Sequence, residues 1–385
     1  MEGDTVEVGQ AQEVKVWDPA LRLFHWLLAG SVFGAALTGF LERRLQLGLH
    51  LAFGTSIGVL LLFRLIWGFF GPTYARFASF LHPPGAVIEH LRELRHPRPV
   101  QHLGHNPLGA LMVFGLFTVL AALVGTGLVV LGGMLAEGPV ASFTSYAVGR
   151  PLLFVHGGLA VLLVLMIAGH LGGVAFESRR GEHLVRAMIS GAKRVGPRTR
   201  WAQPAQARPF AAAAVLVAGL FVSAAGIAAL SALPDPRVPP VPASRKTHAA
   251  KAYARECSAC HMAYPPELLP ARSWAAIMGG LSHHFGEDAS LGSRRETAAI
   301  SAYLVANAAA HWDTLPAHLF RVVDPAQPLL ISATPAWRRL HRHIPPAVFH
   351  SKAVGSPAAC DACHRDAATG LFAPQNIHIP KKAMP

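Results

Sequence analysis

The sequence predicts an all-α protein, in which a transmembrane four-helix bundle and a fifth anchoring helix precede a loop-rich α-helical domain. Hydrophobic residues make up 52% of the 385 residues and charged residues only 14%, which is typical of a protein partly embedded in a membrane. Five apolar stretches are long enough to span a bilayer, which takes about 20 residues. They lie at about residues 23–41, 49–70, 107–133, 152–175 and 210–233. All four cysteines follow the last of these stretches.

The apolar stretches divide the chain into three parts. Residues 1–200 hold the first four spans and form the predicted bundle. Residues 201–243 hold the fifth span and the run Pro234–Pro242, which predicts a stiff, extended linker. Residues 244–385 form the last domain. Because residues 1–20 are polar and acidic, they do not resemble a cleavable signal peptide, and we expect the fifth span to deliver the last domain across the membrane.

Lysine and arginine are distributed unevenly between the predicted loops. Residues 1–21, 71–106 and 175–209, which share one side in a five-span topology, hold thirteen of them. Residues 42–48 and 134–151, on the opposite side, hold three. The positive-inside rule therefore predicts a multi-pass protein of the bacterial inner membrane, with a cytoplasmic N-terminus and a periplasmic C-terminal domain. This distribution accounts for the formal charge of +13 without a nucleic-acid partner.

A histidine directly follows both cysteine pairs, in the motifs Cys257-Ser-Ala-Cys260-His261 and Cys360-Asp-Ala-Cys363-His364. In such a motif two thiols form thioethers with the vinyl groups of a haem, and the histidine supplies one axial ligand to the iron. Because the motif occurs twice with no cysteine left over, we expect two covalent haems c. The alternatives are disulfides or a zinc site, which a Cys-x-x-Cys pair also forms. Neither explains a histidine after both pairs.

Four histidines lie in or at the ends of the predicted spans: His25, His50, His156 and His170. Ionisable residues in a bilayer are costly and usually functional. His156 and His170 are separated by about 21 Å along a helix and lie within about 40° of the same face, so one helix can serve two sites. By depth, we expect one haem b between His25 and His170 and another between His50 and His156. Histidines bonded to carbonyls or head groups are the alternative.

Helical patterns recur in the last domain, at Tyr253–Arg255, Trp274–Met278 and most clearly Glu296–Asn307. Met278 is a candidate thioether ligand, but packing within its helix is the preferred interpretation. Three other histidines of this domain are expected on the surface: His248, His311 and His318.

The remaining charged candidates lie near the membrane boundaries. Arg22, Arg64 and Arg150 are expected either to pair with haem propionates or to reach the lipid head groups. Five histidines between the second and third spans fall in a loop expected in the cytoplasm, and their clustering does not by itself predict a metal site: His82, His90, His96, His102 and His105.

Residues 14–190 resemble the bacterial b561-type di-haem cytochromes b, which include the hydrogenase cytochrome b subunits. The resemblance rests on Lys15-Val-Trp-Asp-Pro-Ala-Leu-Arg-Leu-Phe-His25-Trp, on His50 to Arg64-Leu-Ile-Trp-Gly68, and on His156 with His170. It implies a four-helix bundle that holds two haems b and exchanges electrons with a membrane quinone pool.

Residues 248–385 are similar to the small bacterial di-haem cytochromes c that occur with b561-type partners. The similarity rests on CSACHMAYPPELLPARSWAAIMGGLSHHFGEDASL and on VGSPAACDACHRDAATGLF. It implies two low-spin haems c, each with a second histidine ligand. His284 matches the family pattern best, and His341 is the second choice. Three histidines remain rivals for these positions: His283, His343 and His350.

Together these features predict membrane-bound electron transfer. Quinol would reduce the haems b, and electrons would pass through the haems c to a soluble periplasmic redox protein such as a cytochrome. One alternative is a relay subunit that passes electrons between separate enzymes, without quinol oxidation of its own. A haem-based sensor is a second alternative, but it needs an open iron position. No catalytic residue beyond redox transfer is predicted, and a homodimer is compatible with these features.

Overall fold

The computed structural model describes residues 5–6, 12–41, 47–93, 101–195, 199–200, 206–233, 238 and 247–383. The chain forms two compact units. The first, called unit 1, comprises residues 1–127 and 152–228. The second, called unit 2, comprises residues 128–151 and 229–385. Most of the predicted linker Pro234–Pro242 lies outside the described residues.

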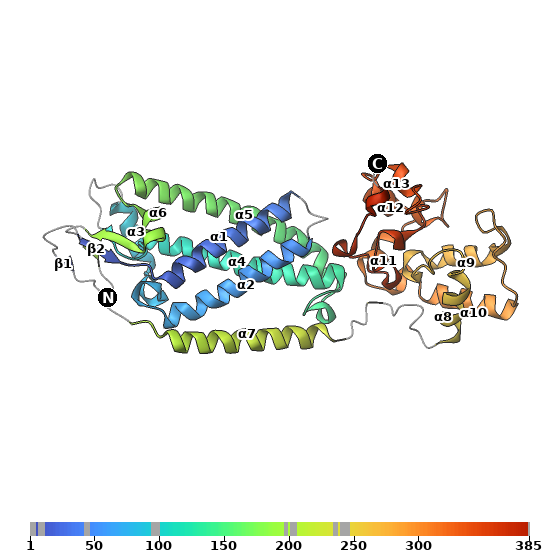
Figure 1. Ribbon diagram of the computed structural model, residues 1–385, viewed down its shortest axis with the longest axis horizontal. Coiled ribbons are helices and arrows are strands. Elements are labelled where there is room, and N and C mark those ends of the chain that lie inside the picture. Colours follow the sequence, from blue (N-terminus) through green and yellow to red (C-terminus); the bar gives the residue numbers. More distant parts are fainter. Residues whose placement is uncertain are drawn as a thin grey trace. The chain divides into compact units, whose positions relative to one another are not determined.

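Five helices among the described residues are long and apolar enough to cross a membrane, as the sequence predicts (Figure 1). They are α1 (Pro19–Phe40), α2 (Leu47–Phe70), α4 (Pro107–Leu135), α5 (Tyr146–Arg179) and α7 (Pro209–Ser231). Helix α5 begins six residues before the predicted span, so Arg150 and Pro151 lie in the helix and not in a loop. Pro151 is the sixth residue of α5, beyond the four whose N–H groups have no partner within the helix, so it removes one backbone hydrogen bond from the second turn.

The start of α1 is fixed by side-chain capping. The carboxylate of Asp18 accepts hydrogen bonds from the backbone N–H groups of Ala20 and Leu21, and Pro19 occupies the first turn. Both features favour a helix start. The other carboxylate oxygen accepts from Trp67 Nε1 at 3.3 Å, which joins the start of α1 to the end of α2.

Aromatic and aliphatic side chains on the bundle helices remain exposed. Phe33 on α1 is 70% exposed, and Phe154 on α5 is 74% exposed. In a soluble protein such side chains would mark an interaction surface. On helices of this length they are the side chains expected to face lipid.

Short elements cover one end of the bundle (Figure 1). They include α3 (Pro84–Glu93) and α6 (Leu184–Ser190) and five strands: β1 (Thr5–Val6), β2 (Gln12–Lys15), β3 (Gln101–His102), β4 (Ala192–Val195) and β5 (Thr199–Arg200). Strand β2 pairs antiparallel with β4, and β5 lies between β1 and β3. The β3–β5 pairing joins segments 71–106 and 175–209, which the topology predicts on one side of the membrane.

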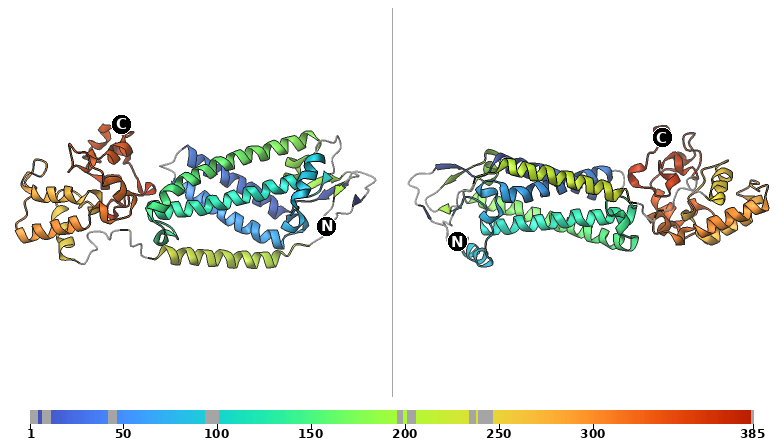
Figure 2. Two further views of the ribbon diagram at one scale, coloured as in Figure 1. Left: turned by 180° about the vertical axis from the view of Figure 1, so that it is seen from behind. Right: turned by 90° about the horizontal axis from the view of Figure 1, so that it is seen from below.

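Unit 2 contains short helices connected by loops (Figure 2). They are α8 (His248–Cys257), α9 (Ala271–Gly279), α10 (Arg294–Ala306), α11 (Leu315–Phe320), α12 (Pro335–His341) and α13 (Pro346–Phe349). The three helical patterns predicted in this domain are thereby confirmed. Side chains of Thr247 and Ser293 accept hydrogen bonds from the first turns of α8 and α10, so both helices have a fixed start.

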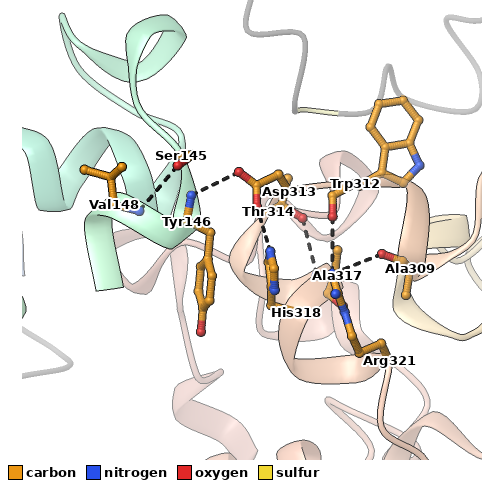
Figure 3. Close-up of polar contacts among 10 residues, drawn as sticks. All are labelled: Ser145, Tyr146, Val148, Ala309, Trp312, Asp313, Thr314, Ala317, His318 and Arg321. Atoms are coloured by element: carbon orange, nitrogen blue, oxygen red, sulfur yellow. Dashed lines mark hydrogen bonds and ion pairs between the residues drawn. The ribbon is translucent and has the colours of Figure 1, made fainter. Parts of the chain in front are cut away.

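The connection between α4 and α5 belongs to unit 2 and contacts its C-terminal part (Figure 3). The backbone N–H of Tyr146, the first residue of α5, donates to Asp313 Oδ2 at 3.0 Å. Asp313 Oδ1 lies 2.7 Å from His318 Nε2. The His318 ring is stacked on the Tyr146 ring, with 3.9 Å between centroids. The prediction that His318 is a surface residue is therefore wrong, because its ring lies between these two partners.

Candidate haem sites

His50 on α2 and His156 on α5 face one another inside the bundle. Their ring centroids lie 6.2 Å apart, at an interplanar angle of 76°. A metal–nitrogen bond is about 2 Å, so two rings that bind one ion from opposite sides have centroids about 6 Å apart. The spacing therefore fits two imidazoles that share one iron.

Hydrogen bonds fix the orientation and the tautomer of both rings. Thr126 Oγ1 donates to the carbonyl of Ala122 at 2.7 Å, so its oxygen is left to accept from His156 Nδ1 at 3.0 Å. His50 Nδ1 donates to the carbonyl of Ala35 at 3.0 Å. Since each Nδ1 carries the proton, each Nε2 has a free lone pair, which is what an iron ligand needs.

Two threonine–glycine pairs surround these rings in the same way. Thr38 Oγ1 lies 3.2 Å from His50 Nδ1, and Thr126 Oγ1 lies 3.0 Å from His156 Nδ1. A Cβ atom at Gly39 would lie 3.2 Å from Cε1 of His50, and one at Gly127 would lie 3.3 Å from Cε1 of His156. The glycines therefore give the rings room, and the preceding threonines orient them. Thr38 and Thr126 are functional residues that the sequence did not single out, and the repeated Thr-Gly dipeptide is the signal that could have identified them.

His25 on α1 and His170 on α5 are the candidates for a second pair in the bundle. The two imidazoles are electrostatic neighbours. Nδ1 of His25 is buried without a hydrogen-bond partner among the described residues. Arg64 is 2% exposed, and its Nη1 atom is likewise buried without such a partner. A buried cation with unused hydrogen-bonding capacity fits a propionate better than a lipid head group.

In unit 2 the first Cys-x-x-Cys-His motif begins at the C-terminal end of α8, which ends at Cys257. The His261 and His284 rings lie 6.3 Å apart between centroids, close to the spacing of His50 and His156. His261 Nδ1 donates to the carbonyl of Met262 at 2.8 Å, which leaves its Nε2 available.

The second motif repeats this arrangement. The His341 and His364 rings lie 6.2 Å apart between centroids. His341 is the last residue of α12, and its Nδ1 donates to the carbonyl of Trp337 at 2.9 Å. His364 Nδ1 is buried without a partner among the described residues. Tyr264 connects the two motifs. Its ring centroid lies 4.8 Å from that of His261, and its hydroxyl donates at 2.6 Å to the carbonyl of Ala358, two residues before the second motif.

Two family profiles match the chain at these sites. Residues 16–191 match the family described as "Prokaryotic cytochrome b561", and residues 253–372 match "Dihaem cytochrome c". The chain joins a prokaryotic cytochrome b561 to a dihaem cytochrome c. It is therefore an electron-transfer protein with membrane-spanning helices, and its two families imply both haem b and haem c.

Solved structures similar to the dihaem cytochrome c part come from two bacteria. The diheme cytochrome c from Rhodobacter sphaeroides is 46% identical, and the match covers 32% of this chain and 95% of that one, with a TM-score of 0.28. The diheme cytochrome from Shewanella baltica OS155 is 36% identical over 35% of this chain and 96% of that one, with a TM-score of 0.29. The family assignment rests on the family profile that matches residues 253–372.

Curated relatives of the cytochrome b561 part are hydrogenase subunits. A probable Ni/Fe-hydrogenase B-type cytochrome subunit from Rhizobium leguminosarum is 24% identical over 47% of this chain and 89% of that protein. A protein of the same description from Azotobacter vinelandii is 29% identical over 30% of this chain and 60% of that protein.

Within the dihaem cytochrome c part, the rival ligands lie elsewhere. The rivals to His284 and His341 are exposed, and no ring pairing places them opposite His261 or His364 among the described residues: His283, His343 and His350. Met278 is 7% exposed in the core with Trp274 and Ile300, so its predicted packing role is confirmed. His248 and His311 are exposed, as predicted.

The four cysteines are free thiols in the structure. Burial raises the pKa of the Cys257 thiol and of the Cys360 thiol to about 11, so both are protonated at neutral pH. Thiolate is the form that attacks disulfides and binds zinc. The observation that favours a haem site over either alternative is that the histidine after each cysteine pair faces a second imidazole.

Proposed function

We propose that this chain transfers electrons from membrane quinol, through two haems b and two haems c, to a soluble redox protein outside the cytoplasm. The carrying observation is that one chain holds imidazole pairs of matching geometry in a membrane-type bundle and in a dihaem cytochrome c domain. The ring spacings of 6.2, 6.3 and 6.2 Å in three pairs support bis-histidine ligation.

We assign each pair to one cofactor. His25 and His170 hold one haem b, and His50 and His156 hold the other. Cys257, Cys260 and His261 bind the first haem c, with His284 on its opposite face. The second haem c takes its ligands from the second motif and from α12: Cys360, Cys363, His364 and His341. Each haem iron supplies one-electron redox chemistry.

The proposed orientation places the N-terminus in the cytoplasm and the dihaem domain in the periplasm of a bacterium. The excess of lysine and arginine in segments 71–106 and 175–209 supports it. Oxidation of one quinol releases two protons and two electrons, and the electrons leave one at a time. The final contact with a soluble partner is expected to be small and transient.

A second function is favoured by the hydrogenase relatives. In that case the b561 part receives electrons from a separate enzyme and does not oxidise quinol itself. The similarity to B-type cytochrome subunits supports this reading. The two functions differ in whether the purified chain, without a second enzyme, is reduced by quinol.

The test mixes purified, oxidised protein with a reduced short-chain quinol in a stopped-flow instrument. Quinol oxidation predicts reduction of both haem types without any added enzyme. A variant with His50→Ala and His156→Ala should leave the haems c oxidised by quinol, although dithionite still reduces them. His311→Ala, at an exposed position, is the matched control. If quinol reduces the haems c in the double variant at the wild-type rate, the proposed route is wrong; if quinol reduces nothing in the wild type, the relay function is favoured.

A further inference from the structure

We propose that His90, Glu93 and His102 form a binding site for a divalent cation of the zinc class, separate from the haem sites. One ligand atom from each residue lies within 4.8 Å of the other two. Two imidazoles and a carboxylate, with a fourth position left to water, is a ligand set that Zn²⁺ takes in proteins.

The buried imidazole of His90 is the independent observation that points to a ligand. His90 is 3% exposed, yet neither ring nitrogen has a hydrogen-bond partner among the described residues. A buried polar group without a partner is costly. Its Nδ1 lies 3.5 Å from Glu93 Oε2, beyond hydrogen-bond geometry but close enough for both atoms to reach one ion.

Helix α3 and strand β3 bring the three side chains together. His90 and Glu93 are three residues apart on α3, so they share one face. They lie in its last turn, where the exposed carbonyls favour positive charge. The His102 ring lies 5.4 Å from the His90 ring between centroids, at an interplanar angle of 84°.

The backbone of His102 is held from two directions. Its strand β3 pairs in parallel with β5, with His102 opposite Arg200. Lys193 Nζ donates to the His102 carbonyl at 3.1 Å, and its charge is offset by Glu182 at 4.0 Å.

The three ligand atoms must move closer together to bind one ion. Tetrahedral ligands about 2 Å from zinc lie roughly 3.4 Å apart, so bringing ligand atoms that are up to 4.8 Å apart to this distance needs a movement of about 1 Å. Side-chain rotation of Glu93 and His102 can supply it, because both are only half-buried.

A bound ion would connect α3 to the sheet of β1, β5 and β3. All three ligands lie in segment 71–106, and the pairing of β3 with β5 extends this connection to segment 175–209. The competing explanation is an ion pair between protonated His90 and Glu93, which needs no metal.

The test uses the full-length, haem-loaded protein, stripped with EDTA and titrated with Zn²⁺ against a chromophoric chelator. We expect one tight site per chain, and an X-ray absorption spectrum with only nitrogen and oxygen ligands at about 2.0–2.1 Å. His90→Gln, Glu93→Gln and His102→Gln should each weaken binding at least tenfold. His311→Gln, an exposed histidine elsewhere, should leave it unchanged.

The haem spectra of every variant report whether the fold is kept. If His90→Gln fails to fold, Glu93→Gln still decides, because glutamine keeps the size and shape of the glutamate side chain, which is 18% exposed, and removes only its charge. Equal zinc affinity in the wild type and in Glu93→Gln, or no zinc bound by the stripped wild-type protein in the titration, would overturn the proposal in favour of the ion pair.

Discussion

Replacing Thr126 by valine should raise the midpoint potential of the haem b assigned to His50 and His156. In the structure Thr126 Oγ1 accepts from His156 Nδ1 at 3.0 Å. Such a bond makes an imidazole a stronger donor, which favours ferric over ferrous iron. Valine keeps the shape of threonine but removes the acceptor, so the ferric state loses stability relative to the ferrous state.

The magnitude follows from the strength of one partly buried hydrogen bond. A net contribution of about 0.5–1.5 kcal/mol is typical. For a one-electron couple about 1.4 kcal/mol corresponds to 59 mV, so the expected increase is roughly 20–60 mV. The potential shifts only because the hydrogen bond stabilises ferric haem more than ferrous haem; equal stabilisation of the two states would give no shift.

Optical redox titration of the purified protein measures this potential directly. Thr118→Val is the matched control, because Thr118 lies on the same helix and is exposed, and its hydroxyl donates only to the carbonyl of Phe114. Thr38→Val should shift the same potential less than Thr126→Val does, because His50 Nδ1 keeps its hydrogen bond to the carbonyl of Ala35. A shift in Thr126→Val that is no larger than in Thr118→Val, or that is negative, would refute the tautomer argument.

Three further outcomes are expected. The purified chain should contain haem b and haem c in a ratio of one by pyridine haemochrome analysis, and a ratio far from one would contradict the four-site assignment. His284→Ala should let reduced haem c bind carbon monoxide, whereas His283→Ala should not; the opposite result would reassign the ligand. Asp313→Ala should make the Tyr146 amide exchange hydrogen about tenfold faster, because a charge-assisted bond that is partly exposed contributes about 1.4 kcal/mol; Asp324→Ala is the control, and equal exchange in both would show that the contact is not formed.

The sequence predicted the architecture because its signals are local. A span needs only length and hydropathy, and a Cys-x-x-Cys-His motif needs only adjacent residues. The pairing of His50 with His156 followed from helix periodicity and depth. The His284 ring faces His261, and the His341 ring faces His364. Both agree with the second axial ligands that the family resemblance, rather than the residues themselves, suggested.

Features that depend on contacts between distant segments were missed. Thr126 orients a ring that belongs to another helix, and a threonine inside an apolar span is not distinctive by itself. His318 was expected on the surface because nothing near it in sequence indicates Tyr146 as its partner. The short strands of unit 1 are also non-local, since β3 and β5 pair across about a hundred residues.

The contact between Tyr146 and Asp313 changes where the dihaem domain should be considered to begin. Its C-terminal residues and the α4–α5 connection belong to one compact unit, although two membrane helices, α5 and α7, lie between them in sequence. A fragment cut at residue 244 would lack residues 128–151 and would present Asp313 and His318 to water. On one chain, by contrast, a tether supplies an effective concentration of about a millimolar, so even a weak contact is occupied much of the time. Anyone exchanging this domain for that of a relative should therefore exchange the α4–α5 connection with it.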